Sequence, residues 1–267
     1  MVEFWKFHGL GNDFVIIEGP SNALTEEQVI AICRRHRGVG ADGVLLVELQ
    51  CRRPTPRIKL VVYNSDGSRP EMCGNGVRCV AAFAQQHWKV DREVVVESDA
   101  GDRRCVIEAD TEKRWNVTVD MGEAKASASK DRFEVDGEEF QFVEVDVGNP
   151  HAVIFRSVSS EQVRRAGEVA NDNHRLFPGG VNVEFVHPSE ARGRFVASIY
   201  ERGVGMTQAC GTGACAVAEA VWESGRMERS QAVQIELPGG ELIMESRDDR
   251  IWMKGSAEAV FCGVWRG

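Results

Sequence analysis

The feature that most constrains this chain is an internal repeat, because residues of the same type recur 137 positions apart along much of its length. The matches are concentrated in Gly, Asn and Cys. Two further matches lie at other offsets: Ala100-Gly101 corresponds to Gly239-Gly240 at a slightly larger offset, and Met121 to Ala124 corresponds to Ser256 to Ala259 at a slightly smaller one. Small loop insertions would explain these differences. The matching residues are Gly11-Asn12 with Gly148-Asn149, Gly43-Val44 with Gly180-Val181, Tyr63 with Tyr200, Cys73-Gly74 with Cys210-Gly211, and Gly76 with Gly213. The pattern predicts two similar halves.

The 267 residues suit two domains of about 130 residues each. We expect an N-terminal half over residues 1–123 and a C-terminal half over 124–267, and the last few residues could return to the first half. The joint is expected within residues 122–130, which are polar and rich in small side chains, as linkers are. One large domain with a coincidental glycine spacing is the alternative.

Composition and charge narrow the class of protein. With 43% hydrophobic and 27% charged residues the chain is expected to be globular. A net charge of -9 and the absence of a long basic run disfavour a nucleic-acid partner. The apolar runs are strand-sized, and the N-terminus lacks the pattern of a secretory signal. We therefore expect a cytoplasmic protein whose eight cysteines are reduced thiols.

Short β-branched runs bounded by Gly, Asn or Pro predict mostly strands in each half. The predicted strands cover 14–17, 43–48, 58–63, 94–97 and 115–120 in the first half, and 145–147, 152–155, 181–186, 194–200, 233–237 and 251–254 in the second. Two helices per half complete the pattern. One helix is predicted over 25–35 and its counterpart over 161–170, and the second helix of each half follows Cys73 or Cys210 with apolar residues at helical spacing.

The motifs Cys73-Gly74-Asn75-Gly76 and Cys210-Gly211-Thr212-Gly213 are thus predicted to lie at helix N-termini. Exposed N–H groups and the positive end of the helix dipole favour an anion there, so we expect a lowered thiol pKa and a place for a substrate carboxylate. The glycines let the backbone approach a ligand closely.

Two activated thiols in equivalent positions indicate a reaction with the same symmetry. Inversion of a stereocentre by proton transfer fits, since one group removes a proton from one face and the other delivers a proton to the opposite face. Backbone N–H groups would stabilise the enolate-like charge, as an oxyanion hole does. No cofactor is needed for this chemistry.

Other interpretations of the cysteines remain open. Either motif Cys could be a small packed residue, and Cys33, Cys51, Cys79, Cys105, Cys215 and Cys262 are most simply structural. Zinc is disfavoured, because the spacings Cys73–Cys79 and Cys210–Cys215 do not match the usual ligand pairs and no His completes a set.

Several motifs, in order along the whole chain, resemble the diaminopimelate epimerase family. They are Phe7-His8-Gly9-Leu10-Gly11-Asn12-Asp13-Phe14, Gly38-Val39-Gly40-Ala41-Asp42-Gly43, Tyr63-Asn64-Ser65-Asp66-Gly67-Ser68, Met72-Cys73-Gly74-Asn75-Gly76, Gly148-Asn149-Pro150-His151, Val181-Asn182-Val183-Glu184-Phe185, Tyr200-Glu201-Arg202-Gly203 and Ala209-Cys210-Gly211-Thr212-Gly213.

The resemblance implies an α/β (α+β) fold of two similar domains, each a mostly antiparallel sheet wrapped around a central helix. It also implies cofactor-independent interconversion of LL- and meso-diaminopimelate in lysine and peptidoglycan precursor synthesis, with no metal and a possible homodimer. By the same resemblance Cys73 and Cys210 are the acid/base pair, flanked by His151 and Glu201. The implied substrate-binding residues are Asn12, Asn64, Gly74, Asn75, Asn149, Asn182, Glu201, Arg202, Gly211 and Thr212.

The residue chemistry agrees, since Arg202 suits a carboxylate and Asn side chains suit an ammonium beside a carboxylate. The chain departs from the family at two positions, with Met206 where many members carry Glu and Gly43 where some carry Gln. The competing functions are a racemase of the same fold for another amino acid, and a thiol redox or metal-binding module.

Overall fold

The computed structural model describes the backbone of residues 1–267 and all side chains except those of residues 128–130. The chain divides into two compact units. Unit 1 comprises Met1–Asp120 and Lys254–Gly267, and unit 2 comprises Met121–Met253. The first unit therefore contains both ends of the chain.

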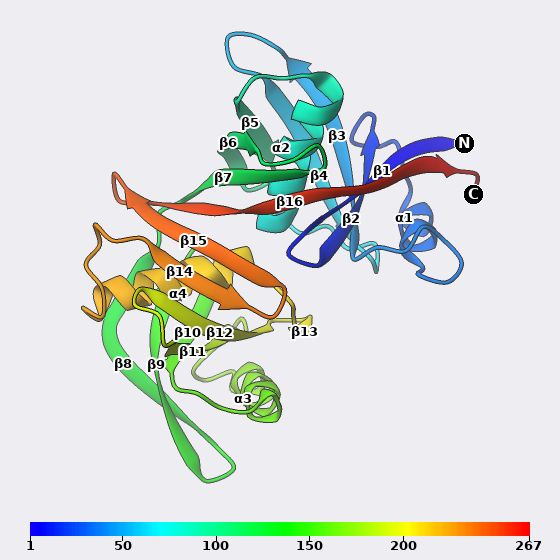
Figure 1. Ribbon diagram of the computed structural model, residues 1–267. Coiled ribbons are helices and arrows are strands. Elements are labelled where there is room, and N and C mark those ends of the chain that lie inside the picture. The colour runs from blue at the N-terminus through cyan, green and yellow to red at the C-terminus, as the bar shows by residue number, and fades with distance from the viewer. The chain divides into compact units, whose positions relative to one another are not determined.

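The strands of unit 1 close into a ring. In chain order they are β1 (Val2–Gly9), β2 (Asn12–Glu18), β3 (Gly43–Cys51), β4 (Arg57–Asn64), β5 (Glu93–Ser98), β6 (Gly101–Ala109), β7 (Arg114–Gly122) and the later part of β16 (Arg250–Trp265). Each strand pairs with the next, β7 pairs with β16, and β16 pairs with β1. The ring closes only because the last strand of the chain lies between the first and the seventh (Figure 1).

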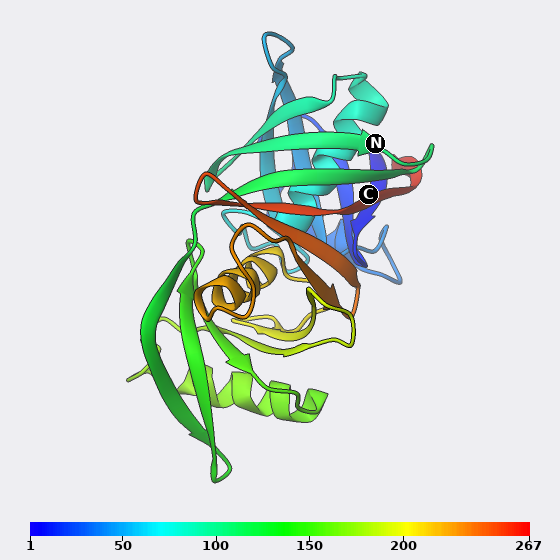
Figure 2. The same cartoon turned by 60° about the vertical axis from the view of Figure 1, so that its left-hand side comes forward.

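Helix α2 (Gly74–Trp88) fills this ring. It contacts every strand from β1 to β6, and Figures 1 and 2 show it among the strands. Its side chains Val77, Val80, Ala81 and Ala84 are fully buried, as their helical spacing predicts. Helix α1 (Glu26–Cys33) lies against β3 and begins at Thr25, whose hydroxyl accepts from the Gln28 N–H in a capping box.

Unit 2 has the same kind of architecture. Its strands are β8 (Lys125–Val135), β9 (Glu138–Asp146), β10 (Pro150–Phe155), β11 (Asn182–Pro188), β12 (Arg194–Glu201), the short β13 (Gly205–Met206), β14 (Val233–Leu237) and β15 (Gly240–Arg247). Helix α4 (Gly211–Glu223) contacts β8 to β12, β14 and β15. Helix α3 (Ser160–Asp172) packs on β11 and β12 and starts at a second capping box, formed by Ser159 and Gln162.

Strand pairing confirms the repeat. In unit 1 the successive pairs from β1 to β6 are antiparallel, parallel, antiparallel, parallel and antiparallel. In unit 2 the pairs β9–β10, β10–β11, β11–β12, β12–β14 and β14–β15 follow the same sequence. The predicted fold class, two similar domains with mostly antiparallel sheets around a central helix, is therefore correct.

The register corrects one match within the repeat. Gly43 pairs with Phe14 and Asn64, and the residue that takes the same place between β10 and β12 is Asn182 rather than Gly180. The match of Gly43 with Gly180 is coincidental, because two extra residues precede β11. The correspondence of Gly101 with Gly240 holds, since both begin the second strand of a hairpin.

The polar segment predicted as the joint has a regular structure. Residues 125–130 belong to β8, which pairs with β9, although the side chains of 128–130 lie outside the described part. Small polar residues occur both in linkers and in edge strands, and here the pairing with β9 makes the segment a strand. Among the described residues, no helix is long and apolar enough to cross a membrane.

Candidate active site

Cys73 is the N-cap residue of α2. Its backbone is extended (φ -138°, ψ 112°), its carbonyl accepts the first helical hydrogen bond from Val77 at 2.9 Å, and its side chain is half-buried. A Cβ on Gly76 would lie 3.1 Å from Leu45 and 3.5 Å from the Cβ of Cys73, so the first turn is packed tightly. The thiol therefore stands where helix N–H groups point outward.

Asn75 is fixed by a buried arginine. Arg78 is fully buried, and its Nη2 donates to Asn75 Oδ1 at 2.8 Å while its Nε donates to the Ser256 carbonyl at 3.3 Å. Buried guanidinium groups are rare unless paired. The contact orients the Asn75 amide with its oxygen toward Arg78, and sequence reasoning did not identify this role for Arg78.

Asn12 and Asn64 lie at the ends of neighbouring strands in unit 1. Asn12 opens β2 after the tight turn Leu10-Gly11, in which both residues have positive φ. Asn64 ends β4, and its Nδ2 donates to the Ser68 hydroxyl at 2.9 Å. Asn12 is half-buried and Asn64 is exposed, so both side chains are placed on the surface of the unit.

Cys210 is the N-cap residue of α4, as Cys73 is of α2. Its thiol sulfur accepts from the Gly213 N–H at 3.3 Å and lies 3.4 Å from the Thr212 hydroxyl. The residue is 6% exposed, in contrast to the half-buried Cys73. The structure thus places both motif cysteines at equivalent helix starts, as the sequence predicts.

The electrostatic surroundings of Cys210 differ from expectation. Burial raises the pKa of its thiol well above the ordinary value, and the carboxylates of Glu201 and Glu184 raise it further. The contacts from Thr212 and Gly213 lower it by less. The expectation of a lowered pKa is therefore wrong for Cys210 in this structure, because desolvation of the thiolate outweighs the helix N–H groups.

A buried chain of polar groups runs beside α4. His151 Nδ1 lies 2.7 Å from Glu184 Oε1, and His151 Nε2 lies 3.0 Å from Asn149 Oδ1. His151 and Glu184 have no exposed surface, whereas Asn149 is half-buried. Burial raises the pKa of Glu184, and the neighbouring His151 opposes that rise. Sequence reasoning missed Glu184, although a single carboxylate among the apolar residues of β11 was the available signal.

Asn182 clamps two backbone segments. Its Nδ2 donates to the Pro150 carbonyl at 3.1 Å and its Oδ1 accepts from the Arg202 N–H at 3.0 Å. Arg202 in turn donates from Nη1 to the Gly179 carbonyl at 2.6 Å, and its side chain is exposed. Glu201 precedes it at the end of β12 and is half-buried. The amide of Asn182 keeps one donor and one acceptor position for a ligand.

In each unit, then, the structure gathers a cysteine at the start of the central helix and polar side chains at neighbouring strand ends. The repeat pairs Cys73 with Cys210, Asn12 with Asn149, and Asn64 with Glu201. Gly74 and Gly211 begin α2 and α4, and both are buried. Met206 is 40% exposed in β13. At Gly43 a Cβ would lie 2.4 Å from the Tyr63 carbonyl oxygen, so a larger residue here would require the backbone to shift.

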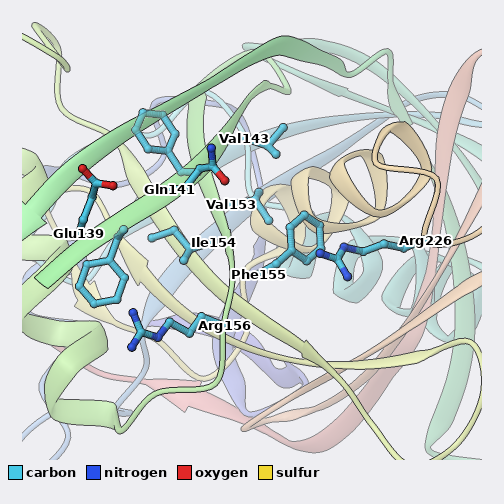
Figure 3. Close-up of a pocket in the computed structure, with 10 residues that line it drawn as sticks. Glu139, Gln141, Val143, Val153, Ile154, Phe155, Arg156 and Arg226 are labelled. Carbon is cyan, nitrogen blue, oxygen red and sulfur yellow. The ribbon is translucent and has the colours of Figure 1, made fainter.

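Two further features are separate from these residues. Across all residues except 128–130, no group of three or more His, Cys, Asp and Glu side chains could hold a metal ion. A hollow of about 270 Å³ is lined by residues of β9 and β10, together with Arg156 and with Arg226, which covers the Phe155 ring at 4.1 Å (Figure 3). Its lining contains none of the predicted site residues.

Comparison with known proteins identifies the family. The family model described as diaminopimelate epimerase matches residues 4–127 and 143–260, which together include both cysteine motifs and most of the chain. The chain belongs to the diaminopimelate epimerase family.

Full-length relatives agree with this assignment. A diaminopimelate epimerase of Desulfitobacterium hafniense is 39% identical, with 98% of this chain and 98% of the relative covered. One of Geobacillus thermodenitrificans is 36% identical over 98% of this chain and 96% of the relative.

Solved structures with lower identity share the fold. A probable proline racemase from Agrobacterium radiobacter has a TM-score of 0.74 at 15% identity, with 99% of this chain and 92% of that chain covered. A predicted epimerase from Pseudomonas aeruginosa has the same TM-score at 15% identity, with 98% of both chains covered. These matches extend the fold beyond the diaminopimelate epimerase family.

Proposed function

We propose that this protein is a diaminopimelate epimerase that moves the α-proton of its substrate between two thiols, Cys73 and Cys210. The observation that carries the proposal is the equivalent position of the two cysteines, each the N-cap of the central helix in its own repeat. A reaction that inverts one stereocentre needs one proton acceptor and one donor, and the exchange of these roles in reverse matches a repeated structure.

In the forward direction one thiolate takes the α-proton, and the C–H electron pair moves into the substrate carboxylate as an enolate-like charge. The other thiol then gives its proton to the opposite face of the α-carbon. Burial raises the pKa of the Cys210 thiol, which favours Cys210 as the proton donor in this direction. The two cysteines therefore end a turnover with their protonation states interchanged. In the reverse reaction their roles as donor and acceptor are exchanged.

Backbone N–H groups would stabilise the charge that develops on the substrate. The first residues of α2 and α4, including Gly74 and Gly211, carry N–H groups without helical partners. Such preorganised donors act as an oxyanion hole for an enolate-like carboxylate. Thr212 would lower the pKa of the Cys210 thiol, because its hydroxyl lies 3.4 Å from the sulfur. This chemistry proceeds with side chains and backbone alone, without a cofactor or metal.

The second amino-acid end of diaminopimelate calls for a cation and neutral amides. The Arg202 guanidinium suits its carboxylate, and Glu201 suits an ammonium. The proposed amide contacts are made by Asn12, Asn64, Asn75, Asn149 and Asn182. We assign His151 an indirect part, since both of its ring nitrogens already have protein partners.

In the cell we propose a cytoplasmic enzyme of lysine and peptidoglycan precursor biosynthesis. Its partner would be the small-molecule substrate, with a second copy of the chain in a possible homodimer and no nucleic acid. The net charge of -9 supports the absence of a nucleic-acid partner.

The deciding experiment incubates the reduced protein with LL-diaminopimelate in D₂O without added cofactor. We expect meso-diaminopimelate that carries deuterium at the inverted α-carbon, seen by chiral chromatography and mass spectrometry. The variants Cys73→Ser and Cys210→Ser serve as controls and should each lose epimerisation by several orders of magnitude. Inversion that survives either substitution would contradict the two-thiol mechanism, and activity only toward another amino acid in a panel would transfer the proposal to a racemase of that substrate.

A further inference from the structure

The His151–Glu184 pair occupies positions that are apolar in the other half of the protein. In the matching register of unit 1, Phe14 corresponds to His151 and Leu45 to Glu184. All four side chains are at most 3% exposed, and Leu45 and Glu184 approach the central helix of their unit. The close approach is also repeated, since a Cβ on Gly76 would lie 3.1 Å from Leu45 and one on Gly213 would lie 3.0 Å from Glu184 Oε1.

Unit 1 therefore shows that the fold itself is satisfied by hydrophobic side chains at these two places. A buried ionisable pair is usually no more stabilising than well-packed hydrophobic residues of similar size. The fold of unit 2 therefore does not require the pair, and the pair contacts Asn149 directly through His151 Nε2.

The number of protons in the chain of contacts fixes how Asn149 is held. Its Oδ1 lies 3.0 Å from His151 Nε2, so Nε2 must carry the hydrogen of that bond. One further proton is then shared between His151 Nδ1 and Glu184 Oε1, 2.7 Å apart. Whether that proton resides on nitrogen or on oxygen, the pair is neutral overall and Nε2 stays protonated.

The opposite orientation of the amide is electrostatically worse. If Asn149 donated from Nδ2 to a bare Nε2, His151 would be neutral with its hydrogen on Nδ1, and Glu184 would be either an uncompensated carboxylate or an acid with its proton on Oε2. Glu184 is fully buried, and among the described residues its Oε2 has no hydrogen-bond partner. An isolated buried carboxylate is costly, and so is a buried hydroxyl without an acceptor. Both forms of Glu184 are therefore disfavoured in the opposite orientation, which leaves the one in which the Asn149 oxygen faces His151.

We propose that Glu184 is a positioning residue that acts through His151 to lock the Asn149 amide, so that its NH₂ group is presented to the ligand. The role of Asn149 as a ligand contact rests on the proposed function. Because Asn149 is half-buried while its two supporters are fully buried, the chain of contacts leads from the interior to the surface. The presented group donates two hydrogens, and it therefore selects a carboxylate over an ammonium at this point of the substrate.

The test measures the protonation of His151 Nε2 directly. Protein labelled with ¹⁵N-histidine is compared by NMR with the His151→Phe variant, which assigns the His151 signal among the six histidines. We expect a protonated Nε2 in the wild type. In Glu184→Leu, Nδ1 loses its partner and the proton shared with it, so the Nδ1 signal should shift to that of a bare imidazole nitrogen and Nε2 no longer has to carry the hydrogen. In Glu184→Gln, an amide that donates to Nδ1 should preserve the wild-type state of Nε2.

Kinetics provide the second readout. For meso-diaminopimelate, Glu184→Leu should raise KM by about tenfold or more, as expected for loss of one hydrogen bond to a charged group, with a smaller change in kcat. Glu184→Gln should remain within a few-fold of the wild type. The double variant His151→Phe/Glu184→Leu copies unit 1 at both positions, so it should keep its thermal stability while its KM rises.

Several outcomes would overturn the proposal. A bare Nε2 in the wild type would do so without any variant. A stable double variant with wild-type KM would also do so, because the pair would then have no effect on binding. If the protein shows no diaminopimelate activity, the NMR result still decides whether Glu184 locks His151 and Asn149, and only the identity of the ligand is lost.

Discussion

Asn75 and Asn182 have the same side chain, yet their neighbours give them different tasks. The oxygen of Asn75 is held by the buried Arg78, whereas Asn182 uses its oxygen and nitrogen to join the backbones at Arg202 and Pro150. Asn75 is therefore a side chain set in one orientation, and Asn182 is a clamp that shapes the loop carrying Arg202. We therefore expect substitution of Asn75 to affect mainly ligand binding, and substitution of Asn182 to affect mainly the structure of the loop that carries Arg202.

A second cluster at residue scale supports β2 next to Asn12. Lys6 contacts Asp13 and the Gly40 carbonyl, Arg35 donates to Asp13 at 2.7 Å, and Arg35 also contacts Asp42. Burial alone would raise the pKa of Asp13, but the hydrogen bonds from Arg35 and Lys6 outweigh it and hold that pKa well below its usual range. Asp42 lies beside Asp13, and its pKa is raised by burial and by that neighbour.

Asp13→Asn should destabilise the protein by about 1–3 kcal/mol at pH 7, because Lys6 is then buried without its counter-charge. A carboxyl whose native pKa is depressed stabilises the fold fully above its unfolded pKa of about 4, and that contribution decreases as the pH falls toward the native value. The difference between wild type and variant in urea unfolding should therefore be smaller at pH 3 than at pH 7. The exposed Asp91→Asn is the control, and a pH-independent difference for Asp13→Asn would contradict the ionic explanation.

The sequence predicts some of these residues and not others, for a physical reason. Cys73 and Cys210 are predictable because the repeat compares them within one chain and because a cysteine before glycines at a helix start has distinctive chemistry. Arg78 and Glu184 are not, since a charged residue in a helix or strand is usually solvated. Only the packing in the structure shows that they are buried beside Asn75 and His151.

At the scale of elements, glycines decide how closely helices approach the sheets. Gly167 lies in the middle of α3, where a Cβ would come 2.1 Å from the Tyr200 ring on β12. Helix propensity alone would favour alanine at this position by about 1 kcal/mol. The clash of that Cβ with the Tyr200 ring would destabilise the protein instead, and the close contact at Gly167 determines the distance between α3 and β12.

Gly167→Ala should therefore lower the free energy of unfolding by about 1–3 kcal/mol in spite of its better helix propensity. The matched control is Gly179→Ala, where the only close atom to a Cβ is the end of the Arg202 side chain at 3.8 Å, and where we expect a change within about 0.5 kcal/mol. Urea unfolding followed by circular dichroism measures both. An increase in stability for Gly167→Ala would mean that α3 can move away from β12 without cost.

Elements with strong periodicity or caps were predicted, and polar strands were not. The helices at 26–33 and 160–172 follow from Thr25 and Ser159 as caps, and each was predicted to within a few residues. Strand β6 was missed because Asp102, Arg103 and Arg104 dominate its start, yet pairing with β5 and β7 makes it a strand. Long-range pairing of this kind outweighs local propensity.

For the molecule as a whole, the division into two units makes a prediction about cooperativity. Ala257 lies in β16 within unit 1 and is fully buried. Ala257→Glu would place an unpaired carboxylate there, at a cost of several kcal/mol. We expect hydrogen exchange followed by mass spectrometry to show lost protection in residues 1–120 and retained protection in 121–253. Equal loss of protection in both ranges would show that the chain unfolds as one cooperative unit.

The position of the last strand also governs the order in which this protein can be completed during synthesis. Translation delivers β1 to β7 first, but β1 and β7 lack their common neighbour until Lys254–Gly267 has emerged. Unit 2 has all of its residues by Met253, so a nascent chain can finish its second unit before its first. Until Lys254–Gly267 has emerged, the first unit carries two unpaired strand edges, which are sites for aggregation. During synthesis, the edges of β1 and β7 in the first unit are therefore exposed to aggregation for the longest time.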